Sequence, residues 1–100
     1  MQGQVTERRR SPRESGYGMA LLVPRHRSAE RVSGVLIDSN DDGFRVRHKY
    51  SAFKENDLVS FFHRSRQGTA RVIWSRNLGT EFETGFSYVE THGDPTRFGV

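Results

Sequence analysis

Four arginines near the N-terminus form the densest group of potential ligand-binding side chains in this chain. The stretch ERRRSPRES places them within six positions, as Arg8, Arg9, Arg10 and Arg13. A guanidinium group can hold two phosphate oxygens, or the O6 and N7 acceptors of guanine, and it can stack on a base. Pro12 opposes a helix because it lacks an amide hydrogen and biases the preceding residue away from helical angles. We therefore expect a basic, non-helical arm suited to an anionic ligand.

A second polar stretch, DSNDDG beginning at Asp38, offers several oxygen ligands in a short turn. Asp38, Asn40 and Asp42 match positions 1, 3 and 5 of a calcium-binding EF-hand loop, and Gly43 matches position 6. Position 12 of that loop requires a glutamate, and this chain has Lys49 there. The other interpretation is a turn whose polar side chains bind its own backbone, with Gly43 at a positive φ. The residues favour the turn over calcium.

The sequence lacks the residue patterns of common catalytic and metal centres. It contains no cysteine, so neither a disulfide nor a thiolate nucleophile is available. The four histidines are scattered without metal-binding spacing, and no GxSxG nucleophile motif occurs. We therefore expect a binding module that is not an enzyme and that holds no metal or cofactor.

The positive charge of the chain is concentrated near its beginning. The net charge is +4 over 100 residues, and residues 1–31 contain seven arginines against three glutamates, which accounts for all of it. The remaining residues hold nine basic and nine acidic side chains. A localised excess of this kind favours an anionic partner.

The early residues are polar and contain no long apolar run, so we expect a cytoplasmic protein of one domain.

Beyond the arm, the chain alternates between apolar and polar residues as β-strands do. The expected strands are residues 18–23, 33–38, 43–49, 58–63, 69–75 and 84–90. Turn-forming residues separate them at intervals of about ten residues, and no stretch keeps a helical apolar period. This pattern predicts an all-β fold with little helix, in the form of a closed barrel or a small sandwich.

Trp74 has two interpretations. It shares one expected strand face with Ala70 and Val72. A single tryptophan on an apolar strand face is usually part of the core, and we expect core packing here. The alternative is that its indole packs on a guanine base, so Trp74 is also a candidate ligand-binding residue.

The order of these features resembles a PilZ domain, over about residues 7 to 90. That family is a six-stranded antiparallel β-barrel of the split-barrel type, which binds the bacterial second messenger cyclic di-GMP. Its signature is Arg-x-x-x-Arg in an N-terminal arm, followed by Asp/Asn-x-Ser-x-x-Gly. Arg9 and Arg13 match the first part, and Asp38 and Gly43 match the ends of the second. The chain departs from this signature at residue 40, where Asn40 stands in place of the family serine.

The resemblance implies a second-messenger receptor whose arm closes over a ligand on the barrel. The implied parts are a flexible basic arm at 1–16, a barrel at 17–90 and an irregular tail at 91–100. Asp38 would accept hydrogen bonds from the N1 and N2 donors of guanine, and Arg8 supplies the extra arginine that many members carry. The implied ligand-binding residues are Arg8, Arg9, Arg13, Asp38, Asn40, Gly43 and Trp74.

Two alternatives remain open. A basic β-barrel can bind single-stranded nucleic acid when aromatic and basic side chains alternate on an exposed face. A PilZ-like domain that has lost its nucleotide can also act through contacts with a downstream effector protein alone, and Asn40 keeps this alternative open.

We predict that Asn40→Ser tightens binding of cyclic di-GMP. The asparagine amide can replace a serine hydroxyl in a hydrogen bond, but it is longer and crowds a bound base. Calorimetric titration of both proteins measures the difference. An unchanged or lower affinity in the serine variant would contradict the family pattern at this position.

Overall fold

A computed structural model describes residues 14–15, 18–64 and 66–92 of the chain. Its elements are β1 (Glu14–Ser15), β2 (Met19–Pro24), the 3₁₀ turn η1 (Arg25–Arg27), β3 (Val32–Ser39), β4 (Gly43–His48), β5 (Leu58–His63), β6 (Arg66–Asn77) and β7 (Phe82–His92). The six strands expected from the sequence correspond to β2 through β7, with β6 and β7 longer at both ends. Within the described ranges, no helix is long and apolar enough to cross a membrane.

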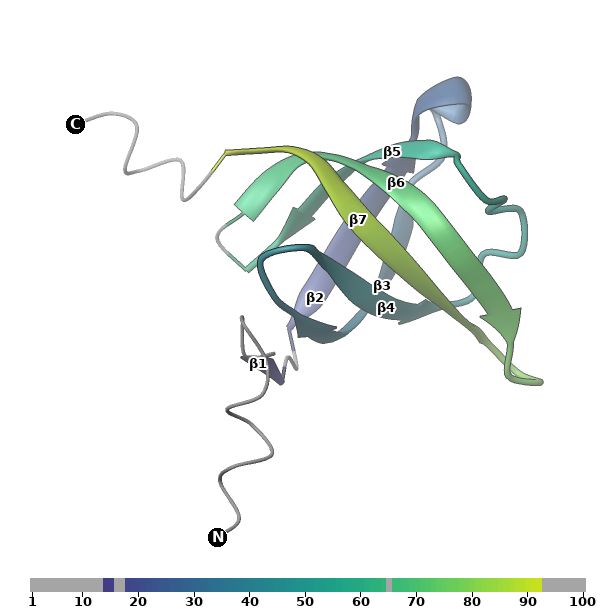
Figure 1. The fold of residues 1–100 in the computed structure, drawn as a ribbon. Coiled ribbons are helices and arrows are strands. Elements are labelled where there is room, and N and C mark those ends of the chain that lie inside the picture. The colour runs from purple at the N-terminus through teal and green to yellow at the C-terminus, as the bar shows by residue number, and fades with distance from the viewer. Residues whose placement is uncertain (1–13, 16–17, 65, 93–100) are drawn as a thin grey trace, which may run out of the picture.

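Strands β2 to β7 close into an antiparallel barrel (Figure 1). The hydrogen-bonded order is β3-β2-β5-β6-β7-β4, and β4 pairs back onto β3. The long strands β6 and β7 run side by side over most of their length. The six-stranded antiparallel barrel predicted from the sequence is confirmed. The two-residue β1 adds to the end of β3, with Glu14 opposite Ser39 and Ser15 opposite Asp38.

An aromatic cluster around Phe44 fills the barrel interior. Phe44 is fully buried and stacks on Phe86, with ring centroids 4.8 Å apart. Phe61 and Tyr88 contact the same ring at 5.0 Å and 5.4 Å. Phe53, from the irregular connection between β4 and β5, packs edge-on against Phe86. Such ring contacts contribute about 0.5–1.5 kcal/mol each beyond the burial of apolar area.

The alternation expected for the third strand is confirmed in β4. Phe44 and Val46 point into the barrel, and Arg45 and Arg47 lie on its outer face. This is the pattern that a strand with one buried face requires, because successive side chains point to opposite sides.

A β-bulge in β6 makes the core placement of Trp74 wrong. Val72 pairs with Phe86 and Trp74 pairs with Gly85, so Ile73 is an extra residue between two successive pairs. The extra residue reverses the alternation, because one added position turns every later side chain to the other face. Trp74 therefore lies on the outer face of the barrel with 37% of its surface exposed.

A second bulge has the same effect in β3. Leu36 pairs with Val46 and Asp38 pairs with Arg45, which leaves Ile37 as the extra residue. Leu36 is in the core, whereas Asp38 stands beside Arg45 on the outer face. The bulge thus keeps the Asp38 carboxylate out of the apolar interior.

Two histidines are buried among the core side chains. The backbone amide of Tyr50 donates to His48 Nδ1 at 3.0 Å, so Nε2 carries the proton and donates to Thr84 Oγ1 at 2.6 Å. His63 Nε2 lies 3.0 Å from the hydroxyl of Tyr88. Burial lowers the pKa of His48 from 6.5 to about 4. Burial, together with the nearby charges of Arg66 and Arg64, lowers the pKa of His63 to about 4.

We predict that the protein loses stability as the pH falls from about 6.5 to about 4. At neutral pH both imidazoles are neutral in the folded and unfolded states. Below about pH 6.5 the unfolded chain binds protons that the folded state resists, so the free energy of unfolding decreases by about 2 kcal/mol per histidine at pH 5. Urea unfolding at about pH 7.5 and about pH 5 measures this loss.

The exposed His26 provides the matched control for this experiment. His26→Gln is expected to leave the loss unchanged, because this side chain lies on the surface and not among the core side chains. His63→Phe is expected to reduce it. Equal unfolding free energies of the parent protein at the two pH values would contradict the prediction.

Candidate functional site

An open groove of about 760 Å³ lies on the outer face of the barrel, over β4 and β7. One wall is formed by Ile37 and Asp38 of β3, and the other by Ile73 and Trp74 of β6. Both isoleucines are the extra residues of the bulges described above in β3 and β6. The bulges therefore place a carboxylate and an indole on opposite sides of one groove.

Two glycines in the groove, Gly43 and Gly85, stand where neighbouring groups leave no room for a side chain. A Cβ on Gly43 would overlap the carbonyl oxygen of Phe86 on the neighbouring strand. The expected positive φ of Gly43 is wrong: among the described glycines, positive φ occurs at Gly68 and Gly79. Gly43 is required instead by the close approach of β4 to β7. A Cβ on Gly85 would lie 2.5 Å from Cε2 of Trp74, so the indole lies directly against this glycine.

Asp38 is held in place by a two-point ion pair with Arg45. Arg45 Nε donates to Asp38 Oδ1 at 3.0 Å, and Arg45 Nη2 donates to Oδ2 at 2.5 Å. The hydrogen bond to Asp38 is the main cause that raises the pKa of Arg45 above its ordinary value. The carboxylate predicted to face guanine is therefore oriented toward the groove by its neighbour on β4.

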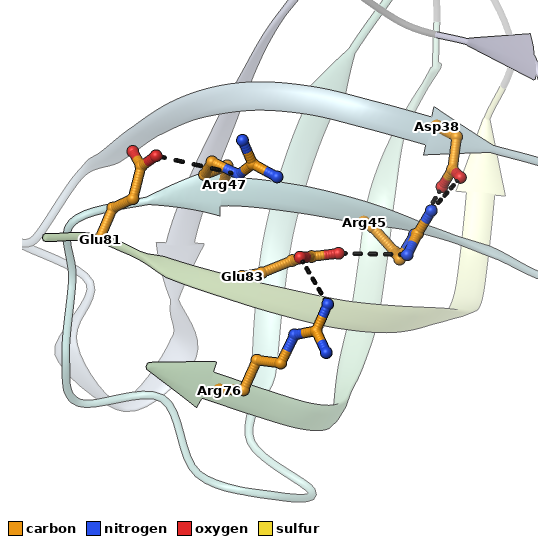
Figure 2. A network of polar contacts seen from close by, with 6 residues as sticks. All are labelled: Asp38, Arg45, Arg47, Arg76, Glu81 and Glu83. Carbon is orange, nitrogen blue, oxygen red and sulfur yellow. Dashed lines mark hydrogen bonds and ion pairs between the residues drawn. The ribbon is translucent and has the colours of Figure 1, made fainter. Parts of the chain in front are cut away.

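The ion pair is part of a network across the four strands β3, β4, β7 and β6 (Figure 2). Arg45 Nη1 also donates to Glu83 Oε2 at 3.2 Å, and Arg76 Nη2 donates to Glu83 Oε1 at 3.1 Å. The Glu83 side chain is only 4% exposed. Two arginines offset its charge, because a carboxylate with so little water needs charged donors. Arg76 in turn lies over the ring of Trp74, at 5.7 Å.

The turn between β3 and β4 is capped by Asn40. Its Oδ1 accepts hydrogen bonds from the backbone amides of Asp42 at 2.8 Å and Gly43 at 3.1 Å. The prediction of a turn whose polar side chain binds its own backbone is thus confirmed. Within the described part of the chain, no group of three or more histidine, aspartate or glutamate side chains is arranged to hold a metal ion.

The structure brings together three of the residues predicted for ligand binding. Asp38, Gly43 and Trp74 all line the groove. Asn40 shapes the adjoining turn through its bonds to the backbone. A serine hydroxyl can make one of these bonds, so Asn40→Ser preserves a capped turn and its effect on affinity stays a prediction. The predicted arm residues Arg8, Arg9 and Arg13 lie outside the described residues.

Sequence reasoning missed Arg45, Glu83 and Gly85 as parts of the site. Their place depends on strands that are distant in the sequence, since Arg45 pairs with Gly85 across β4 and β7. A local signal existed for Arg45 only: a basic residue on the outer face of the strand that follows the DSNDDG turn.

The sequence of the chain matches no protein-family model, and no curated protein matches it at a significant level. The function is therefore inferred from the residues of the groove and of the arm.

We predict that Gly43→Ala destabilises the fold by about 1–3 kcal/mol, the usual cost of forcing an extra methyl group into a packed site. The new Cβ would meet the backbone of β7, which cannot move away without breaking its pairing with β4. Gly18→Ala is the control, because no heavy atom lies within 4 Å of a Cβ built there. Urea unfolding measures the free energy of unfolding of both variants. An equal decrease in the two would show that the close approach at Gly43 does not affect stability.

Proposed function

We propose that this protein binds cyclic di-GMP in the groove between Asp38 and Trp74 and acts as a signalling module of the PilZ type. The observation that carries the proposal is the meeting of a carboxylate, a guanidinium and a partly exposed indole in one groove, beside the strand that follows the arginine-rich arm. On binding, the module would pass a change in the arm to a downstream effector protein.

The walls of the groove suit a guanine base. Asp38 offers acceptor oxygens for the N1 and N2 donors of guanine, a pairing that the other common bases do not provide. The Trp74 indole lies between Gly85 and Arg76, and its exposed part offers an apolar surface for contact with a base.

The entry of the chain into the barrel supports a role for the arm at the same place. Ser15 pairs with Asp38, and Glu14 pairs with Ser39. Arg13 directly precedes Glu14 in the sequence, and Arg9 lies four residues earlier. The signature arginines thus precede a segment that is fixed at the wall of the groove. Guanidinium groups supplied from this side can bind the two phosphates of the ligand.

Trp74 makes a direct test possible because it is the only tryptophan in the chain. Titration with cyclic di-GMP should change its fluorescence and show saturable heat in a calorimeter. GTP and a short single-stranded oligonucleotide serve as comparators. Tighter binding of the oligonucleotide would favour the nucleic-acid alternative. Binding of none of the three would favour a domain that acts through protein contacts alone.

We predict that Arg9→Ala and Arg13→Ala each weaken binding of cyclic di-GMP by about ten- to a hundredfold, the value of one charge-assisted pair. Arg10→Ala is the matched control, because it removes the same charge from the same arm outside the signature spacing. Its effect should be much smaller, since a charge outside the signature contributes only long-range attraction, which salt largely screens. Calorimetry of the three variants decides the point: equal losses would indicate diffuse attraction and would contradict a specific clamp.

A further inference from the structure

Arg45 occupies a position that its ion pairs alone do not explain. Its side chain is 35% exposed and lines the groove between the two walls. A guanidinium carries five N–H groups. Three of them are directed to Asp38 and Glu83. Two further N–H groups, on the terminal nitrogens, are therefore available to a ligand in the groove.

Asp38 and Arg45 form a composite edge that carries an acceptor beside a donor. They lie directly opposite each other on β3 and β4. Each oxygen of the Asp38 carboxylate accepts a hydrogen bond from Arg45, and a carboxylate oxygen can accept more than one. The pair can therefore accept hydrogen bonds at the carboxylate and donate them at the adjoining guanidinium without separating.

We propose that Arg45 determines specificity for guanine in this groove. The inference rests on the proposed function and adds a residue that lies outside the family signature. The Watson–Crick edge of guanine places the O6 acceptor beside the N1 and N2 donors, which complements a guanidinium beside a carboxylate. Adenine presents an amino group where guanine has O6, and an acceptor at N1. Donor would then face donor at Arg45, and acceptor would face acceptor at Asp38, so the site disfavours adenine.

Glu83 acts as the positioning residue for this recognition. Its buried carboxylate binds Arg45 on one oxygen and Arg76 on the other. Arg45 is consequently held at two points, by Asp38 and by Glu83, before any ligand arrives (Figure 2). A donor fixed in this way loses little conformational freedom on binding, which sharpens discrimination between bases.

The test compares the affinities for cyclic di-GMP and cyclic di-AMP, measured by calorimetry on the full chain. The parent protein is expected to prefer the guanine ligand by about a hundredfold or more, because a site built to hydrogen-bond one group rejects its replacement strongly. Arg45→Met, which keeps the length of the side chain and removes its donors, should reduce this preference at least about tenfold. Arg45→Lys, which restores a charged donor, should retain part of the preference.

Arg47→Met is the matched control. Arg47 lies two residues further along the same outer face, and its Nε is 3.9 Å from Glu81. This substitution should leave the ratio of affinities unchanged. If Arg45→Met does not fold, as judged by thermal unfolding, the ratio for Arg45→Lys against the parent serves in its place.

The outcomes separate the inference from the proposed function. If the parent protein prefers cyclic di-GMP and Arg45→Met keeps the same ratio, Arg45 is a structural ion-pair residue only and the inference fails alone. Equal weakening of both ligands leads to the same conclusion. If the parent binds neither dinucleotide, the proposed function fails and the role of Arg45 fails with it.

Discussion

The closed barrel divides its side chains into two sets, because each residue of a strand faces either the interior or the outside. Two bulges, at Ile37 and Ile73, change this assignment for the residues that follow them. Without them Asp38 would face an aromatic interior, where an unpaired carboxylate is strongly destabilising. With them, Asp38 and Trp74 stand on the two walls of one groove. The whole candidate site depends on these two inserted residues.

The polar network follows from that placement. Once Asp38 is outside, it stands opposite Arg45, and Arg45 reaches Glu83 on the next strand. Asp38, Arg45, Glu83 and Arg76 carry two positive and two negative charges, so the network is neutral as a whole. It can orient donors and acceptors, but it does not attract an anion by itself. The net positive charge of the chain lies in its first 31 residues, which include the arm.

Local periodicity was sufficient to predict the strands, the barrel and the inward face of β4, because strand alternation is a property of neighbouring residues. The face of the barrel on which Trp74 lies could not be predicted from strand alternation, because the bulge at Ile73 shifts that alternation by one residue. A signal was nevertheless present: at both bulges two apolar residues are adjacent, Leu36–Ile37 and Val72–Ile73. The local sequence also led to the wrong reason for the glycine at position 43, which was predicted to have a positive φ. A side chain is excluded there by the carbonyl of Phe86, 43 positions away in the chain, and no local pattern reveals that contact.

In the proposed site, the unbalanced positive charge lies in the arm, whereas the fixed hydrogen-bonding groups lie in the groove. In a neutral network held by several strands, hydrogen-bond directions are fixed before a ligand binds, and salt affects them little because the charges are paired and partly buried. The arginines of the arm carry unbalanced charge, and their attraction for phosphate depends on ionic strength. Selectivity between bases would then arise in the groove, and most of the affinity for phosphate in the arm. Both contributions would act close to Asp38, because its backbone pairs with Ser15 of β1 and its carboxylate binds Arg45.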